Sequence, residues 1–287
     1  MNSALLGLGA ALTWGVHDFL ARFPSRAVGP VTTVLAVTAA GFLVLSAWLL
    51  LGGGTVHIVW PSLWLVAVTG AFFALATLSL FAALALGPIS IVAPIAGSYP
   101  ALAMIFALAQ GARPSGTQWA AIATVMMGVA IVSRSGSRYE ESGALAPGTL
   151  KTVLGLAFLA SVCFAISLSS GQAAVPIFGD VQTTWIARIF GFVTIGAIWL
   201  TQPAERRRLP LRWLPLLCLM GALDVAALGS IVAAGSLPDP AFATVVSSAF
   251  GAITVLLARL ILKEPITPVQ LAGMVLIFGG VGILAGV

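Results

Sequence analysis

Four ionisable side chains lie inside long apolar stretches of this 287-residue sequence: His17, Asp18, Arg188 and Asp224. An ionisable group in such surroundings is costly, so it needs a partner, a wet cavity or a function. Arg188 and Asp224 fall near the middle of their stretches and at similar depths. Two interpretations stay open. The two residues form a structural salt bridge between helices, or they form the floor of a binding site where Arg188 meets a carboxylate and Asp224 meets an amine.

Asp18 and His17, in the first apolar stretch, each have more than one possible partner. Asp18 precedes Arg22 by four residues, and this spacing on a helix allows a salt bridge. The alternative is that Asp18 is a carboxylate for a proton or a substrate. His17 points about 100° away from Asp18 around the helix, and an imidazole ordinarily titrates near neutral pH. His17 is therefore a candidate for proton coupling, with a hydrogen bond to a neighbouring helix as the alternative.

Two prolines, Pro94 and Pro100, interrupt a fourth apolar stretch with the sequence APIAGSYPALA. Proline removes a backbone donor and clashes with the preceding turn, so a kink or break is expected at mid-depth. Broken backbone within a bilayer must line protein or water. Polar side chains at this break, and in the matching stretch of the second half, are candidates for a cavity wall or for hydrogen bonds between packed helices: Ser98, Tyr99, Ser247 and Ser248. Trp14, also deep in its stretch, is a further candidate for the wall.

The overall composition indicates a membrane scaffold for these side chains. Hydrophobic residues make up 60% of the chain and charged residues 7%, against roughly 45–50% and about 25% in soluble domains. So few charges cannot cover a water-facing surface, which excludes a cytosolic enzyme, a nucleic-acid-binding module and a disordered protein. Cys163 and Cys218 lie in apolar runs and no metal-ligand spacing is present, so we expect no cofactor and no metal. The fold class is an all-α integral membrane protein.

Apolar runs long enough to cross a bilayer recur along the whole chain. A membrane-spanning helix needs about 20 mainly apolar residues, and ten such runs are found. Those of the first half are Asn2–Ala21, Pro30–Leu51, Ser62–Leu86, Ser90–Gln110 and Gly116–Val132. Those of the second half are Leu150–Val175, Val181–Leu200, Trp213–Ala234, Ala241–Leu262 and Thr267–Val287.

A polar connecting loop, 134–149, divides the chain into two halves of five runs each, 1–133 and 150–287. At a shift of 152 positions, five residues of Gly111–Val132 are identical to their counterparts in Lys263–Leu284. Because each half has an odd number of runs, the second half must enter the membrane from the opposite side. The sequence therefore predicts ten transmembrane helices arranged as two inverted five-helix repeats.

The basic residues predict how these helices are oriented. With the loops numbered alternately, 11 of the 13 Lys and Arg residues fall on one side, only Arg113 falls on the other, and Arg188 lies within a span. Basic loops favour the cytoplasm. The richer side is therefore expected to be cytoplasmic in a bacterial-type plasma (inner) membrane, with both termini outside.

Two segments carry a resemblance to a known family. LILKEPITPVQLAGMVLIFGGVGIL (Leu260–Leu284) resembles the closing signature of the drug/metabolite transporter superfamily, EamA-type, where a loop with a glutamate leads into a glycine-rich last helix. ALTWGVHDFLAR (Ala11–Arg22) resembles the first helix of that group. The resemblance implies a ten-helix carrier with a central cavity between its third, fourth, eighth and ninth spans. Two features depart from it: Ala112-Arg113-Pro114 stands where a glutamate is frequent, and 52–61 lacks the basic residues of many relatives.

A secondary membrane transporter is the function that these features predict. It would move a small polar, amino-acid-like metabolite by alternating access, with export indicated by family analogy alone. An exporter of lipophilic cations or drugs is the alternative among transporters, and an intramembrane enzyme is the alternative from another class. The expected partners are the small-molecule substrate and the lipid bilayer, without nucleic acid. A homodimer through Gly282 and Gly286 is a further hypothesis, which a monomeric mass in lipid nanodiscs would contradict.

Overall fold

The computed structural model is helical, without strands in the residues that it describes: 3–51, 58–109, 113, 115–135, 139, 145–234, 237, 243 and 246–286. The first half contains α1 (Ser3–Val28), α2 (Pro30–Leu51), α3 (Leu63–Leu86), α4 (Ile89–Ala96), α5 (Tyr99–Ala109) and α6 (Gly116–Ser135). The second half contains α8 (Thr149–Phe178), α9 (Asp180–Leu200), α10 (Leu214–Ala233), α12 (Phe250–Ile261) and α13 (Pro268–Gly286). The short 3-10 helix η1 (Trp60–Ser62) precedes α3, and η2 (Ala204–Arg207) and η3 (Leu211–Trp213) precede α10.

These helices confirm the expectation of an all-α membrane protein. Six of the described helices are long and apolar enough to cross a bilayer, namely α2, α3 with η1, α6, α8, α9 and α10 with η3. The fourth expected span consists of two helices, α4 and α5, as its prolines predicted. The ninth, expected over Ala241–Leu262, forms a continuous helix from Phe250 onwards. Residues 136–138 and 140–144 of the predicted connecting loop lie outside the described part of the chain.

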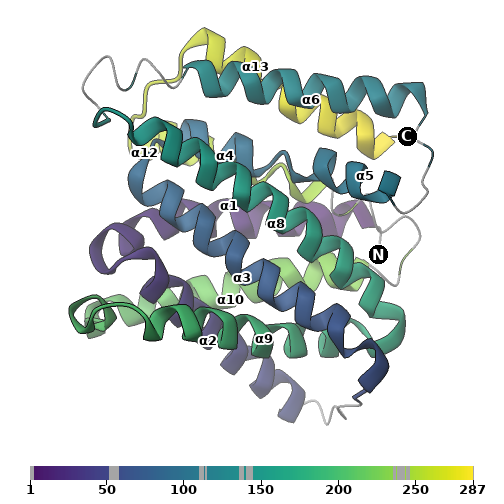
Figure 1. The fold of residues 1–287 in the computed structure, drawn as a ribbon, viewed down its shortest axis with the longest axis vertical. Coiled ribbons are helices and arrows are strands. Elements are labelled where there is room, and N and C mark those ends of the chain that lie inside the picture. Colours follow the sequence, from purple (N-terminus) through teal and green to yellow (C-terminus); the bar gives the residue numbers. More distant parts are fainter. Residues whose placement is uncertain are drawn as a thin grey trace.

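The helices are stacked in tiers, with α6 and α13 forming an outer pair and α2, α9 and α10 lying on the opposite side of the bundle (Figure 1). The α6–α13 contact is close because glycines form it. A Cβ added to Gly128 would lie 2.6 Å from the carbonyl oxygen of Gly273, whereas one added to Gly282 would meet nothing within 4 Å. Helix α1 lies between the tiers, in contact with α10 and α12, and carries three of the expected site residues, Trp14, His17 and Asp18.

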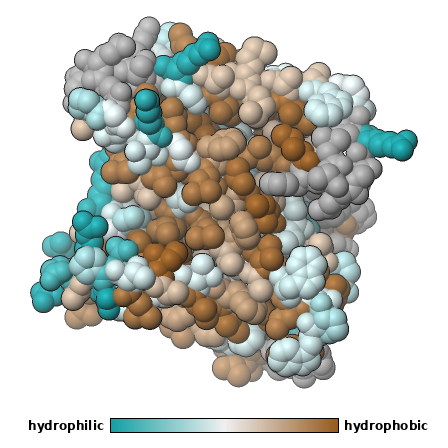
Figure 2. All heavy atoms as spheres, in the orientation of Figure 1, coloured by the Kyte–Doolittle hydropathy of each residue, from teal (hydrophilic) through white to brown (hydrophobic). Residues whose placement is uncertain are grey.

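The molecular surface is apolar across its middle, and most hydrophilic side chains lie toward its ends (Figure 2). Large apolar side chains that are more than 60% exposed include those of Leu43, Trp48, Leu260 and Val275. Such a surface is unfavourable in water but suits the hydrocarbon core of a bilayer.

The two broken segments cross at their breaks. Helix α4 ends at Ala96, and α12 begins after a turn at Ser248 and Ala249. A Cβ added to Gly97 would lie 3.1 Å from the carbonyl oxygen of Ser248, and one added to Gly251 would lie 2.8 Å from the carbonyl oxygen of Ala93. The two segments therefore touch backbone to backbone at mid-depth, where a larger residue would separate them.

Most of the basic residues gather at one end of the bundle, which we call the basic end. The loops after α1, α3, α6, α9 and α12 meet there, while both chain termini lie at the opposite end (Figure 1). Hydrogen bonds join these loops: Arg26 Nε donates to Ala85 O at 3.0 Å, Thr32 Oγ1 to Arg206 O at 2.7 Å, and Tyr139 OH to Pro265 O at 2.9 Å.

Candidate functional site

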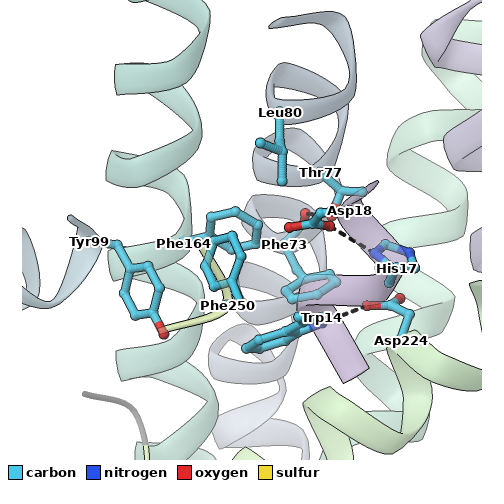
Figure 3. A pocket seen from close by; sticks show the side chains of 10 residues that line it. All are labelled: Trp14, His17, Asp18, Phe73, Thr77, Leu80, Tyr99, Phe164, Asp224 and Phe250. Carbon is cyan, nitrogen blue, oxygen red and sulfur yellow. Dashed lines mark hydrogen bonds and ion pairs between the residues drawn. The ribbon is translucent and has the colours of Figure 1, made fainter. Parts of the chain in front are cut away.

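A small cavity lies between α1, α3, α5, α8, α10 and α12 near the centre of the bundle (Figure 3). We call it the central cavity. Its volume is about 10 Å³, roughly the space that one water molecule needs. Nothing larger than a water molecule therefore fits in this cavity in the present arrangement of helices. The lining residues are Trp14, His17, Asp18, Phe73, Thr77, Leu80, Tyr99, Phe164, Asp224 and Phe250.

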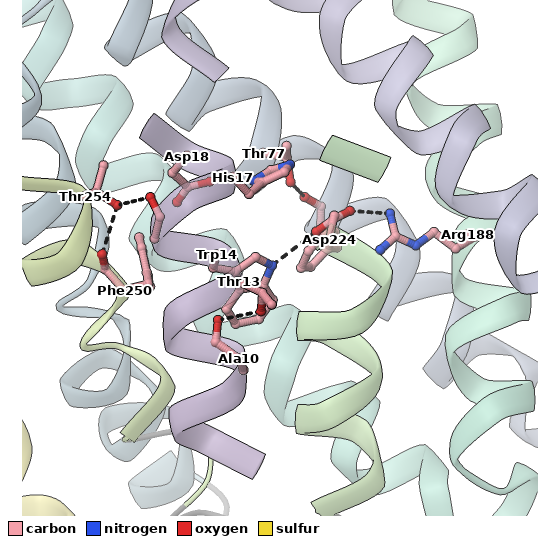
Figure 4. Close-up of polar contacts among 12 residues, drawn as sticks. Ala10, Thr13, Trp14, His17, Asp18, Thr77, Arg188, Asp224, Phe250 and Thr254 are labelled. Carbon is pink, nitrogen blue, oxygen red and sulfur yellow. Dashed lines mark hydrogen bonds and ion pairs between the residues drawn. The ribbon is translucent and has the colours of Figure 1, made fainter. Parts of the chain in front are cut away.

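Asp224 connects three helices through its two carboxylate oxygens (Figure 4). Arg188 Nη1 on α9 donates to Oδ2 at 2.5 Å, and Trp14 Nε1 on α1 donates to Oδ1 at 3.1 Å. Arg188 is 4% exposed and Asp224 is 2% exposed, so the ion pair is shielded from both lipid and water. The two charged residues meet, as their similar depths predicted. Their part in binding stays a prediction.

Asp18 pairs with its neighbour His17 and not with Arg22. The Nδ1 atom of His17 lies 2.8 Å from Asp18 Oδ1, while the other ring nitrogen, Nε2, is buried without a hydrogen-bond partner among the described residues. The expectations of an Asp18–Arg22 salt bridge and of a His17 hydrogen bond to another helix are therefore wrong. Both side chains turn toward the central cavity, and the described residues contain no group of three metal-ligating side chains.

Aromatic rings form much of the cavity wall. The Trp14 ring lies 6.2 Å from that of Phe73, 6.5 Å from Phe164 and 6.3 Å from Phe250. The Arg188 guanidinium also lies over the Phe73 ring, 5.5 Å from its centroid. Trp14, a candidate for the cavity wall, does line the cavity. The phenylalanines could not be predicted from the sequence, because a phenylalanine in an apolar helix usually faces lipid or core.

The four polar candidates at the broken segments divide into two groups. Tyr99 lines the central cavity, and its OH lies 2.6 Å from Ser247 Oγ. Ser98 Oγ donates to Ile95 O at 2.7 Å and lies 3.2 Å from Ser161 Oγ on α8. Ser98, Ser247 and Ser248 do not line that cavity. Ser98 and Ser247 thus hold packed segments together, which is the alternative that the sequence left open.

Glu264 connects α1 and α4 to the loop before α13 at the basic end. Arg22 Nη1 donates to Glu264 Oε1 at 2.5 Å, and the backbone N–H groups of Ile89 and Ser90 donate to Oε1 and Oε2 at 3.3 and 3.2 Å. The carboxylate thus sits at the N-terminus of α4, where unpaired N–H groups and the helix dipole favour an anion. This role of Glu264 is not predictable from the sequence, because its partners Arg22, Ile89 and Ser90 are more than 170 positions away along the chain. We call this cluster the basic-end seal.

A crevice of about 640 Å³ opens at the other end of the bundle, between α1, α2, α9 and α10. Its walls are mostly apolar and include Leu6, Trp48 and Val225. Thr184, also on the wall, precedes Arg188 by one helical turn of α9. The crevice therefore approaches the buried ion pair from the end that carries the chain termini.

An apolar bundle with buried charges at its centre, hydrogen-bonded loops at the basic end and a crevice at the other end has the features of a multi-spanning membrane transporter. The sequence profile of the EamA-like transporter family matches residues 1–134 and again residues 151–286. The chain belongs to the EamA-like transporter family. No curated protein matches it significantly. A solved structure described as "Crystal structure of protein" shares the fold, with a TM-score of 0.68 and 20% identity over 98% of this chain and 96% of that one.

Proposed function

We propose that the chain is a secondary carrier that exports a small polar, amino-acid-like metabolite by alternating access. The observation that carries the proposal is the buried Arg188–Asp224 ion pair beside the central cavity, because ionisable residues within membrane spans are rare and commonly mark a substrate or ion pathway. Asp18, His17 and Trp14 face the same cavity. A zwitterion suits these side chains, because its carboxylate can pair with Arg188 and its ammonium group with a carboxylate of the protein.

Unequal closure of the two ends supports the alternating-access mechanism. At the basic end, the basic-end seal and the hydrogen bonds between loops hold the helices together. At the other end, the 640 Å³ crevice reaches within one turn of Arg188. Export would require the seal to open, the solute to reach the central cavity, and the seal to close again before release through the crevice.

The repeated family match supports an arrangement of two inverted halves. The profile matches each side of the segment around residues 135–150, and five spans in each half would give the halves opposite orientations. We propose repeats over 1–133 and 150–287, joined by 134–149. Ser98, Tyr99, Ser247 and Ser248 would then lie near the crossing between the halves, with Tyr99 facing the solute and the serines supporting its helix.

The aromatic wall also favours a second candidate substrate, a lipophilic cation. Trp14, Phe73, Phe164 and Phe250 surround Asp18 in the central cavity, and aromatic faces attract organic cations. A drug-resistance assay in a pump-deficient strain separates this candidate from the metabolite. The cation exporter predicts resistance that does not depend on Arg188, whereas the metabolite carrier predicts none.

A counterflow assay tests the carrier proposal. Full-length protein in liposomes loaded with unlabelled amino acids is expected to accumulate at least one labelled amino acid, with a rate that saturates as its concentration rises. The Asp18→Asn variant is expected to lower this rate at least tenfold, because the central cavity loses a carboxylate. Glu205→Gln, an exposed carboxylate on η2, is the matched control and should exchange like the wild type. Flux that neither saturates nor shows counterflow would indicate a channel instead.

The charge bias predicts the orientation of the carrier in the plasma membrane. A reporter that is active only in the cytoplasm should give no signal when it is fused to the C-terminus. The same reporter placed after Arg207, in the basic loop before α10, should give a strong signal. A reversed result would place the crevice on the cytoplasmic side and would turn the proposed export into uptake.

A further inference from the structure

The guanidinium of Arg188 uses only part of its hydrogen-bonding capacity. Its Nη1 atom donates to Asp224, whereas Nε and Nη2 are buried and have no partner among the described residues. These two nitrogens lie on one edge of the planar group, and their N–H bonds point in the same direction. A carboxylate binds to such an edge through two parallel hydrogen bonds. Buried donors without acceptors are costly. A ligand that supplies acceptors to Nε and Nη2 would therefore bind favourably at this edge.

A second small cavity adjoins Arg188. It has a volume of about 10 Å³ and lies between α2, α3, α9 and α10, with Thr38, Gly70, Phe73, Ala74, Ala187, Arg188, Gly191 and Leu228 as its lining. Thr38 and Arg188 are the polar side chains in this set, and the others are small or apolar. Phe73 lines this cavity and the central cavity alike. The Arg188 cavity is therefore a separate compartment on the other side of Phe73.

The charges around Arg188 restrict which carboxylate suits the site. Asp224 already neutralises the guanidinium, so an added carboxylate brings an extra negative charge into the protein interior. A ligand with its own ammonium group leaves the total charge unchanged. Asp18, whose Oδ1 lies beside His17 Nδ1, lines the central cavity and is a carboxylate that such an ammonium group could approach.

We propose that the Nε–Nη2 edge of Arg188, together with the Thr38 hydroxyl, is a carboxylate subsite that is distinct from the aromatic central cavity. The inference rests on the proposed function and specifies its substrate: a zwitterion whose carboxylate binds beyond Phe73, and whose ammonium group lies toward Asp18. Arg188 thus has two tasks, one edge for Asp224 and one for the substrate. In the proposed export cycle the substrate carboxylate leaves through the crevice, because Thr184 on the crevice wall lies one helical turn, about 6 Å, from Arg188.

Ligand binding to the full-length protein in nanodiscs tests this subsite. The probes are the L-amino acids, their carboxamides and the amines formed by removal of their carboxyl groups, with thermal stabilisation as the readout. At least one amino acid is expected to stabilise the wild type, while its carboxamide and its amine bind at least tenfold more weakly. Arg188→Lys keeps the charge beside Asp224 but loses the paired donors, so we expect at least tenfold weaker binding of the amino acid. Arg212→Lys, at an exposed position, is the matched control.

A milder variant covers the case in which Arg188→Lys does not fold. Thr38→Val removes one hydroxyl with little change in shape. It is expected to weaken binding of the amino acid by about threefold to tenfold and to leave binding of its carboxamide unchanged. Equal binding of an amino acid and its carboxamide would overturn the subsite. So would a result in which none of the amino acids binds. If carboxamides or amines show saturable counterflow as well as the acids do, the carrier stands and the subsite falls. If no solute shows counterflow, the carrier proposal itself falls.

Discussion

Replacing Asp224 by alanine is expected to destabilise the protein by about 3–5 kcal/mol, because the charge of Arg188 would remain buried without its partner. Trp14 Nε1 would lose its acceptor at the same time, which adds an unsatisfied donor on α1. Unfolding by SDS in mixed micelles measures the loss. Glu205→Ala removes an exposed carboxylate from the same protein and should leave the unfolding midpoint almost unchanged.

A double variant distinguishes the two interpretations of this ion pair. Arg188→Met combined with Asp224→Leu replaces both charges with apolar side chains of similar size, so the stability lost in Asp224→Ala should largely return. Counterflow is expected to be lost in the double variant, because the solute has lost its charged contacts. Recovery of both stability and counterflow would show that the pair is only a structural lock between α9 and α10.

Replacing Glu264 by alanine is expected to have the second-largest effect, a loss of roughly 3 kcal/mol in stability. The change leaves Arg22, whose side chain is 14% exposed, without its carboxylate, and it removes the acceptor for two N–H groups of α4. Glu264→Gln keeps an acceptor for those N–H groups and should lose less. The measurement is again SDS unfolding of each variant against the wild type.

The same change should also loosen the basic end. The Ser90→Cys variant, made in a protein in which Cys163 and Cys218 are replaced by alanine, reports this opening, because Ser90 is fully buried beside Glu264. A maleimide is expected to label that cysteine faster in Glu264→Ala than in the parent with Glu264 intact. An unchanged labelling rate would mean that Glu264 stabilises α4 without acting as a seal.

The sequence was most informative where composition and local rules decide the structure. The low charge content required a membrane fold, and Pro94 and Pro100 required a break between α4 and α5. The depths of Arg188 and Asp224 followed from counting residues along two helices, so their meeting could be predicted. Each of these inferences depends on one segment or on a simple rise per residue.

The sequence was least informative where distant residues compete for one partner. Arg22 has Asp18 one turn away on its own helix, yet it binds Glu264, which lies 242 positions further along the chain and also occupies the N-terminus of α4. The phenylalanines of the central cavity come from α3, α8 and α12, and nothing in any single helix separates them from lipid-facing residues. The free edge of Arg188 was likewise invisible, because it depends on how Asp224 and Trp14 divide their hydrogen bonds.

The backbone contact between the broken segments bears on whether ions can leak through the protein. At Gly97 and Gly251 the backbones of the two segments are in contact, so we expect a shift of one segment to displace the other. If this contact acts as a fulcrum, separation of the two segments on one side would bring them together on the opposite side. Such coupling would keep a continuous aqueous pore from forming, and it would spare the cell a leak of protons during each cycle.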